Sequence, residues 1–80
     1  MPKSVHSKRQ LFIASAIAAA RRSKGLSQAS VAKALGRHQP FIANIESGER
    51  RVDIVELVDI ARVIELDIQS LIDELRSADS

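Results

Sequence analysis

The stretch from Gln28 to Gly48 constrains the fold most, because its residues fall where two short helices must turn and meet. Ser27 is placed to cap a first helix, and Gly36 permits the positive φ that a tight turn between helices demands. A second helix is expected to open near Gln39 and to end before Gly48, which suits the position after a helix end. The side chains expected to face inward are Val31, Ala32, Leu35, Phe41, Ile42 and Ile45. Ala32 is the small residue among them, and it lets the two helices approach closely where they cross. The sequence therefore predicts two helices that cross at a steep angle.

The outward side of the second helix is expected to carry two amide side chains, which an apolar core would not need. The residues on this side are Gln39, Pro40, Ala43 and Asn44. A glutamine or asparagine amide in such a place can read the edges of bases in DNA. Two helices joined by a glycine also occur in ordinary all-α domains. The joint placement of the small, apolar and polar residues favours a DNA-binding helix-turn-helix over about residues 28–47.

The flanking residues extend this pattern in both directions. It comprises Arg21, Gly25–Gln28, Val31–Ala32, Leu35–Gly36, Gln39, Ile42, Ile45–Glu46, Gly48 and Asp53–Leu57. From about Ile13 to Leu75 the chain thereby resembles the XRE family, the helix-turn-helix regulators similar to phage repressors and Cro. It departs from the usual pattern in having Arg37 where the turn often holds an apolar residue and Pro40 where a small polar residue is common. It also has Glu65 where the last turn between helices usually has glycine.

The resemblance implies a compact all-α domain with five helices, of the phage-repressor DNA-binding type, in a sequence-specific transcription regulator that binds double-stranded DNA. Gln39 matches the family's base-reading glutamine and is expected to contact adenine. Pro40 and Asn44 are expected to read bases beside it, the proline through apolar contact alone because it lacks an N–H group. The resemblance also suggests that Arg21 and Glu46 form a partly buried ion pair between the first and third helices.

Charge is distributed unevenly along the chain, although the net charge is only +2. Residues 1–51 hold ten lysines and arginines against two glutamates, a net +8, whereas residues 52–80 carry a net −6. The basic part should attract phosphates, and the acidic remainder should point away from a duplex. Gln28 is expected at the N-terminus of the helix that Ser27 caps, and a helix N-terminus attracts anions. The residues expected to bind phosphates are Gln28, Arg37, Arg50 and Arg51.

Three more helices are expected around the helix-turn-helix. Ser7 with Gln10 forms a capping box for the first, Asp53 with Glu56 caps the fourth, and Asp67 caps the fifth. The inward residues expected on the first helix are Ile13, Ile17 and Ala20. Those expected on the fourth are Ile54, Leu57, Val58, Ala61 and Ile64, and those on the fifth are Ile68, Leu71, Ile72 and Leu75.

The start of the chain also has the shape of a secretion signal, since basic residues precede the apolar run from Leu11 to Ala20. Ten residues are too few to span a bilayer, and the domain needs this helix. We therefore expect a flexible basic arm at 1–7, the DNA-binding domain at 8–76 and a frayed tail at 77–80. The absence of cysteine suits a reducing compartment, so we expect a cytoplasmic protein without a membrane segment.

The last two helices carry more aliphatic residues than one inward stripe can use. Val55, Ile60, Val63 and Leu66 lie beside the expected core positions, so some of them should be exposed. An apolar patch on a small domain often marks a partner surface, and for a reader of palindromic DNA the natural partner is a second copy. The expected homodimer interface comprises Val55, Val63, Leu66 and Ile68.

Nothing in the sequence favours an enzyme. The three glycines each lie at an expected helix end and do not form a glycine-rich loop that could bind a phosphate. The carboxylates near His38 show no arrangement typical of a catalytic triad. We expect no catalytic residue, no cofactor and no metal site. The alternative function is an antitoxin-like interaction module that masks a partner and binds DNA for autoregulation. Besides DNA, RNA polymerase and a small protein are the candidate partners.

Overall fold

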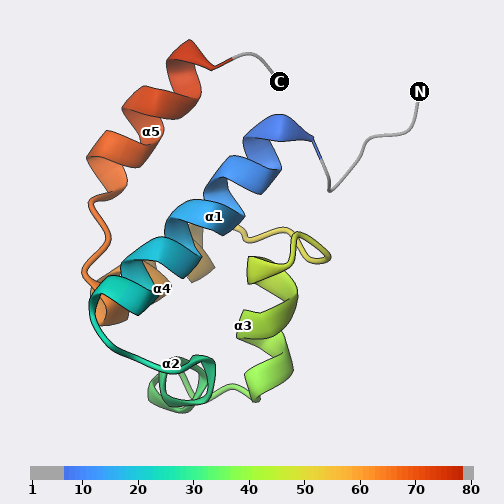
Figure 1. Cartoon of the computed structure of the whole chain (residues 1–80), viewed down its shortest axis with the longest axis vertical. Coiled ribbons are helices and arrows are strands. Elements are labelled where there is room, and N and C mark those ends of the chain that lie inside the picture. The colour runs from blue at the N-terminus through green and yellow to red at the C-terminus, as the bar shows by residue number, and fades with distance from the viewer. Residues whose placement is uncertain (1–6, 79–80) are drawn as a thin grey trace.

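The computed structural model describes residues 7–78, which form five helices and no strand (Figure 1). The helices are α1 (Lys8–Ser23), α2 (Gln28–Ala34), α3 (Gln39–Glu46), α4 (Ile54–Ile64) and α5 (Ile68–Ser77). The predicted all-α fold is confirmed. Residues 1–6 of the expected arm and residues 79–80 of the expected tail lie outside the described part, and Ser77 is the last residue of α5.

Side-chain caps explain where four of the helices begin. The capping bonds run from Gln10 N to Ser7 Oγ (3.1 Å), Ser30 N to Ser27 Oγ (3.0 Å), Glu56 N to Asp53 Oδ1 (2.8 Å) and Ser70 N to Asp67 Oδ1 (3.1 Å). Each bond satisfies an N–H group that the helix itself leaves without an acceptor. On α4 the Asp53 N–H also donates to Glu56 Oε1 (3.1 Å), so the predicted caps Asp53 and Glu56 form a capping box. The side chain of His38 makes no capping bond for α3, whose first turn contains Pro40.

Two of the four residues with positive φ in the described range, Gly36 and Glu65, lie at connections that the sequence singled out. Gly36 has φ +70° between α2 and α3, and a Cβ there would meet nothing within 4 Å, so the requirement for glycine is conformational and not steric. Glu65 has φ 57° and ψ 45° between α4 and α5 and is the one residue other than glycine with positive φ in the described range. The position where the family usually has glycine therefore has the backbone conformation that glycine would favour.

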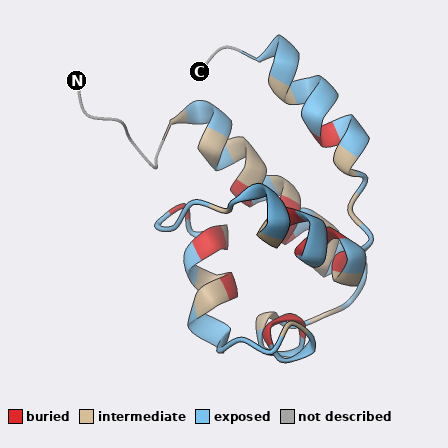
Figure 2. Cartoon of the chain, turned by 180° about the vertical axis from the view of Figure 1, so that it is seen from behind, coloured by how far each residue is buried: buried red, intermediate tan, exposed pale blue. Residues whose placement is uncertain are grey.

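The core is built from one stripe of each helix, and Figure 2 shows the buried residues turned toward the centre of the molecule. Its central cluster consists of Ile17, Val31, Ala32, Ile42, Ile45, Leu57, Ile60, Ile64 and Leu71. Figure 1 shows α5 on the opposite side of α1 from α3, and Leu71 is the one residue of α5 in the central cluster. The predicted inward faces of α2 and α3 are confirmed.

Part of the predicted inward face of α4 is wrong. Ile54 and Val58 are 61% and 40% exposed, whereas Ile60, predicted to lie beside the core positions, is fully buried. Aliphatic residues surround most of this helix, so two neighbouring stripes satisfy the helical period equally well. Packing of α4 against α1 and α2 selects the stripe that contains Ile60. On α5 the prediction for Ile72 is also wrong, since it is 37% exposed.

Candidate nucleic-acid interface

The predicted reading residues lie on the open side of α3. Ala32 and Ile42, 1% and 0% exposed, lie in the core where α2 and α3 pack together. Gln39, Pro40 and Asn44 are all exposed. The helix pair therefore presents two amide side chains and an apolar ring to the solvent, next to one another in the first turns of α3.

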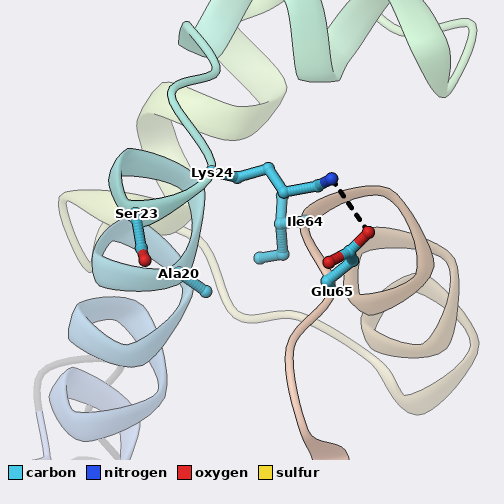
Figure 3. A pocket seen from close by; sticks show the side chains of 5 residues that line it. All are labelled: Ala20, Ser23, Lys24, Ile64 and Glu65. Carbon is cyan, nitrogen blue, oxygen red and sulfur yellow. Dashed lines mark ion pairs between the residues drawn. The ribbon is translucent and has the colours of Figure 1, made fainter.

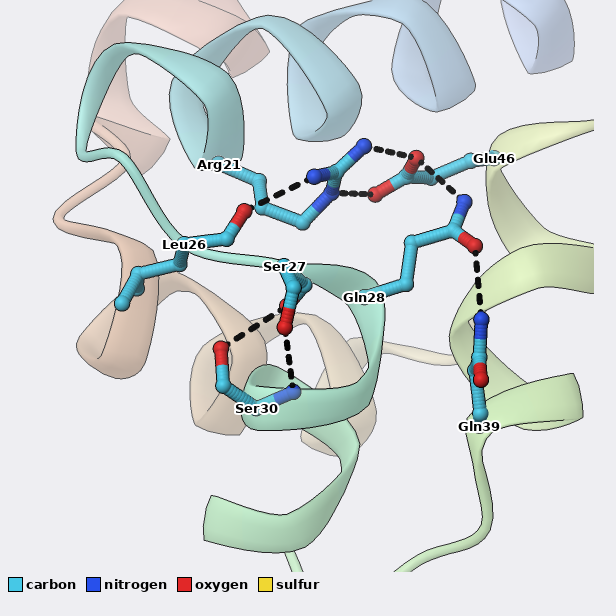
Figure 4. Close-up of polar contacts among 7 residues, drawn as sticks. All are labelled: Arg21, Leu26, Ser27, Gln28, Ser30, Gln39 and Glu46. Atoms are coloured by element: carbon cyan, nitrogen blue, oxygen red, sulfur yellow. Dashed lines mark hydrogen bonds and ion pairs between the residues drawn. The ribbon is translucent and has the colours of Figure 1, made fainter.

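Arg21 and Glu46 form an ion pair that joins the end of α1 to the end of α3 (Figure 4). Arg21 Nε lies 2.6 Å from Glu46 Oε2 and Nη2 lies 2.9 Å from Oε1, while Nη1 donates to the Leu26 carbonyl at 2.8 Å. The two side chains are only 11% and 5% exposed. This bidentate geometry fixes the last turn of α3 against α1.

The surroundings of Glu46 favour its ionised form. Burial alone would raise the pKa of this carboxyl, but the hydrogen bonds from Arg21 and Gln28 outweigh burial and lower the pKa below its ordinary 4.5. Glu46 is therefore a carboxylate at neutral pH. It can accept hydrogen bonds and cannot donate one.

Gln28 connects this ion pair to the reading residues, a role that the sequence did not suggest. Its Nε2 donates to Glu46 Oε1 at 3.0 Å, and its Oε1 accepts from Gln39 Nε2 at 3.3 Å. Gln28 and Gln39 are the first residues of α2 and α3, and the tight turn brings these two helix starts together (Figure 4). The only sequence signal was this shared position, since the residues themselves are eleven apart.

Two of the predicted phosphate-binding arginines meet at a carboxylate. Arg50 donates from both Nη atoms to Glu56 at 3.1 and 3.0 Å, and Arg37 Nη2 lies 3.3 Å from the same carboxylate. The two guanidinium groups lie 4.0 Å (Arg37) and 4.9 Å (Arg50) from the centre of the Phe41 ring, within range of a cation–π contact. The sequence pattern predicted the capping role of Glu56 but not its contacts with the two arginines.

Glu56 is ionised beside these arginines. Burial would raise its pKa, but hydrogen bonds from Arg50 and from the Asp53 backbone outweigh burial and lower the pKa below 4.5. The remaining predicted phosphate residue, Arg51, is exposed, and its carbonyl accepts from Arg50 Nη1 at 2.8 Å. The positive charges of Arg37 and Arg50 beside α3 are thus partly neutralised by Glu56 in the protein without DNA.

Elsewhere the described residues offer no comparable site. An open hollow between α1 and the end of α4 is lined by Ala20, Ser23, Lys24, Ile64 and Glu65 and is crossed by the 2.8 Å ion pair between Lys24 and Glu65 (Figure 3). Both charged side chains are exposed, so this pair closes no defined cavity. Over residues 7–78, no three acidic, cysteine or histidine side chains gather as a metal site would require, and none of the helices could cross a membrane.

Comparison with known proteins agrees with this geometry. A family model described as helix-turn-helix matches residues 17–71. The restriction-modification controller protein C.AhdI from Aeromonas hydrophila has a similar structure, with a TM-score of 0.71 and 24% identity over 82% of this chain and 99% of that one. A mutant of the restriction-modification controller protein C.Esp1396I gives a TM-score of 0.75 and 26% identity over 91% and 98% of the two chains. No curated protein matches the sequence.

Proposed function

The chain belongs to the XRE-type helix-turn-helix family of DNA-binding transcription regulators, and from this premise we propose that it binds a palindromic operator as a homodimer. In this proposal α3 lies in the major groove of each half-site. Two-fold protein symmetry then matches the two-fold symmetry of the DNA, with half-sites about one helical turn apart.

The observation that carries the proposal is the orientation of Gln39. One N–H group of its amide is directed to Gln28, which leaves its Oε1 and the second N–H group for a ligand. Adenine presents a matching pair in the major groove, an N6 donor beside an N7 acceptor. Gln39 is therefore the proposed adenine reader.

Pro40 and Asn44 would contact the neighbouring bases. Both are exposed on α3, one turn apart, and Pro40 can offer only apolar surface, which suits a thymine methyl group. The Asn44 backbone carbonyl accepts from Glu49 N and Arg50 N at 2.9 and 3.1 Å, so its main chain is tied to the following loop while its amide is exposed. These contacts would extend the reading by base pairs beside the adenine.

Phosphate contacts would come from the borders of the helix-turn-helix. Gln28 retains one N–H group beyond its bond to Glu46 and is the first residue of α2. Arg37, Arg50 and Arg51 are exposed around α3. Such contacts set the register on the duplex and carry no sequence information.

The proposed dimer uses the apolar surface of α4 and α5. Of the expected interface residues, Val55 is 67% exposed, while Val63 and Leu66 already pack against the core and Ile68 is half-buried. Ile54 and Val58 extend the exposed surface beside Val55. We therefore place the main contact with a second copy on the first half of α4.

Selection of bound duplexes from a random library, followed by titrations of two variants, tests this function. Gln39→Ala should cost about 1 to 3 kcal/mol on the selected operator and little on a scrambled duplex, because it removes a base contact. Arg50→Ala should weaken both complexes and lower the salt slope by about one, because it removes a phosphate contact. If Gln39→Ala weakens both duplexes equally, Gln39 does not read bases. If no sequence is enriched, the protein is not a sequence-specific regulator of this kind.

A further inference from the structure

We propose that Glu46 determines which base Gln39 accepts, because it dictates through Gln28 which hydrogen-bonding groups Gln39 can offer to DNA. Glu46 itself lies too deep to touch a base, with a side chain only 5% exposed. It would act as a specificity-positioning residue through two amides. The inference rests on the proposed function, in which Gln39 is the base reader.

The first step is the orientation of the Gln28 amide. Glu46 Oε1 accepts from Arg21 Nη2 at 2.9 Å and from Gln28 Nε2 at 3.0 Å. A carboxylate accepts hydrogen bonds only, so a reversed Gln28 would place its carbonyl oxygen against a negatively charged oxygen. The ion pair with Arg21 holds the carboxylate in place. Gln28 is therefore restricted to one of the two orientations that an amide can adopt.

The second step passes this polarity to Gln39. Because Gln28 turns its nitrogen toward Glu46, its Oε1 faces Gln39 and accepts from Gln39 Nε2 at 3.3 Å. A reversed Gln39 would bring two carbonyl oxygens together. One of the two N–H groups of Gln39 is thus occupied inside the protein, and the groups left for DNA are one acceptor and one donor.

The third step is the match to a base. Adenine offers one donor and one acceptor in the major groove, which suits the groups that remain on Gln39. Guanine offers two acceptors, N7 and O6, and would require both N–H groups of the Gln39 amide. Gln28 holds one of them. Glu46, acting through Gln28, would therefore disfavour guanine at the position that Gln39 reads.

Two variants release Gln39 from this arrangement. Gln28→Met keeps an unbranched side chain of similar length, leaves the Arg21–Glu46 pair in place and removes the amide between them and Gln39. Glu46→Gln puts an amide beside Gln28, and an amide can meet either orientation of its neighbour. Both variants should allow Gln39 to present two N–H groups.

The measured quantity is the ratio of two dissociation constants. One is for the selected operator, and the other is for the same duplex with G·C in place of A·T at the base pair whose preference disappears in Gln39→Ala. Both variants should reduce the wild-type preference for A·T by roughly tenfold, within the discrimination that one bidentate contact supplies. Loss of a phosphate contact by Gln28 weakens both duplexes alike and cancels in the ratio. Arg50→Ala is the matched control, with lower affinity and an unchanged ratio.

The outcomes separate this inference from the proposed function. If Gln39→Ala abolishes the preference for A·T and Gln28→Met leaves it at the wild-type value, the inference is wrong and the proposed function stands. If Gln39→Ala leaves the preference intact, the reading role of Gln39 is wrong, and the inference falls with it. Should Glu46→Gln fail to fold, as a thermal melt would show, Gln28→Met decides the question alone.

Discussion

Arg21 and Glu46 contribute to stability as an ion pair, and each needs the other as its charged partner. With side chains 11% and 5% exposed, either one alone would be left as a poorly solvated charge. Arg21→Ala and Glu46→Ala should each cost about 3 to 5 kcal/mol, and the double variant should cost clearly less than the two losses added together. Urea denaturation of the four proteins measures this coupling. Strictly additive losses would mean that the pair contributes no specific interaction.

Acid should weaken the fold through Glu46 and Glu56. The pKa of each carboxyl is lowered from 4.5 in the folded protein, so the folded state binds fewer protons than the unfolded chain as the pH falls. Their contribution is complete above the unfolded value near 4.5 and is lost as the pH falls through the lower folded values. Unfolding measurements between neutral and acid pH should show this decline. Glu56→Gln should flatten it, and an unchanged pH profile would contradict the role of Glu56.

Glu65 is a residue whose backbone conformation favours a substitution. Its φ of 57° is a left-handed backbone conformation, in which a Cβ atom comes too close to the following carbonyl oxygen. Glycine has no Cβ and adopts this conformation without the steric strain. Glu65→Gly should therefore raise the free energy of unfolding by about 0.5 to 1 kcal/mol. The lost ion pair with Lys24 is exposed and contributes little. Lys24→Ala is the control for that pair, and a destabilised Glu65→Gly protein would overturn the argument.

Glu56, in the first turn of α4, binds Arg37 and Arg50 at the border of the helix-turn-helix. Glu56→Gln keeps a residue that suits the capping box but removes the negative charge shared by Arg37 and Arg50. Affinity for operator and scrambled duplex should both rise by about threefold, with a steeper salt dependence, because phosphates no longer compete with a carboxylate. Titrations across a salt series measure this. Weaker binding to both duplexes would show that Glu56 mainly positions the arginines.

The elements differ in how well their sequence predicts them. Caps and turns are decided by residues within three or four positions, so Ser27, Gly36 and Asp53 predicted helix ends correctly. The inward face of α4 could not be chosen in this way. Aliphatic residues occupy eight of its eleven positions, and only contacts with other helices distinguish Ile60 from Val58.

In the candidate nucleic-acid interface, too, some features could be predicted from the sequence and others could not. The exposed positions of Gln39 and Asn44 follow from the helical period of α3 and were predictable. The bonds of Glu56 to Arg37 and of Gln28 to Gln39 join different helices or loops, across nineteen and eleven residues, and depend on side-chain conformations. Helical periodicity carries no information about such contacts.

Self-association of the protein should depend on the exposed apolar surface of α4, which comprises Ile54, Val55 and Val58. Val55→Lys should shift the protein toward the monomer and weaken operator binding together, since it places a charge in the proposed interface and leaves the core untouched. Sedimentation and titration measure the two effects. Leu11→Lys, on an exposed apolar position of α1 outside the proposed interface, is the matched control. A wild-type monomer at high concentration, with and without DNA, would contradict the dimer and favour the antitoxin-like module.

The hydrogen bonds that join Glu46, Gln28 and Gln39 also bear on how such a regulator changes its target in evolution. A substitution at Gln39 alone leaves Gln28 with an unmatched carbonyl, while a substitution at Glu46 removes the partner of Arg21. Single steps toward a new operator therefore disturb either the neighbouring amide or the fold. Descendants with altered targets should carry paired replacements at positions 28 and 39, and position 46 should change last.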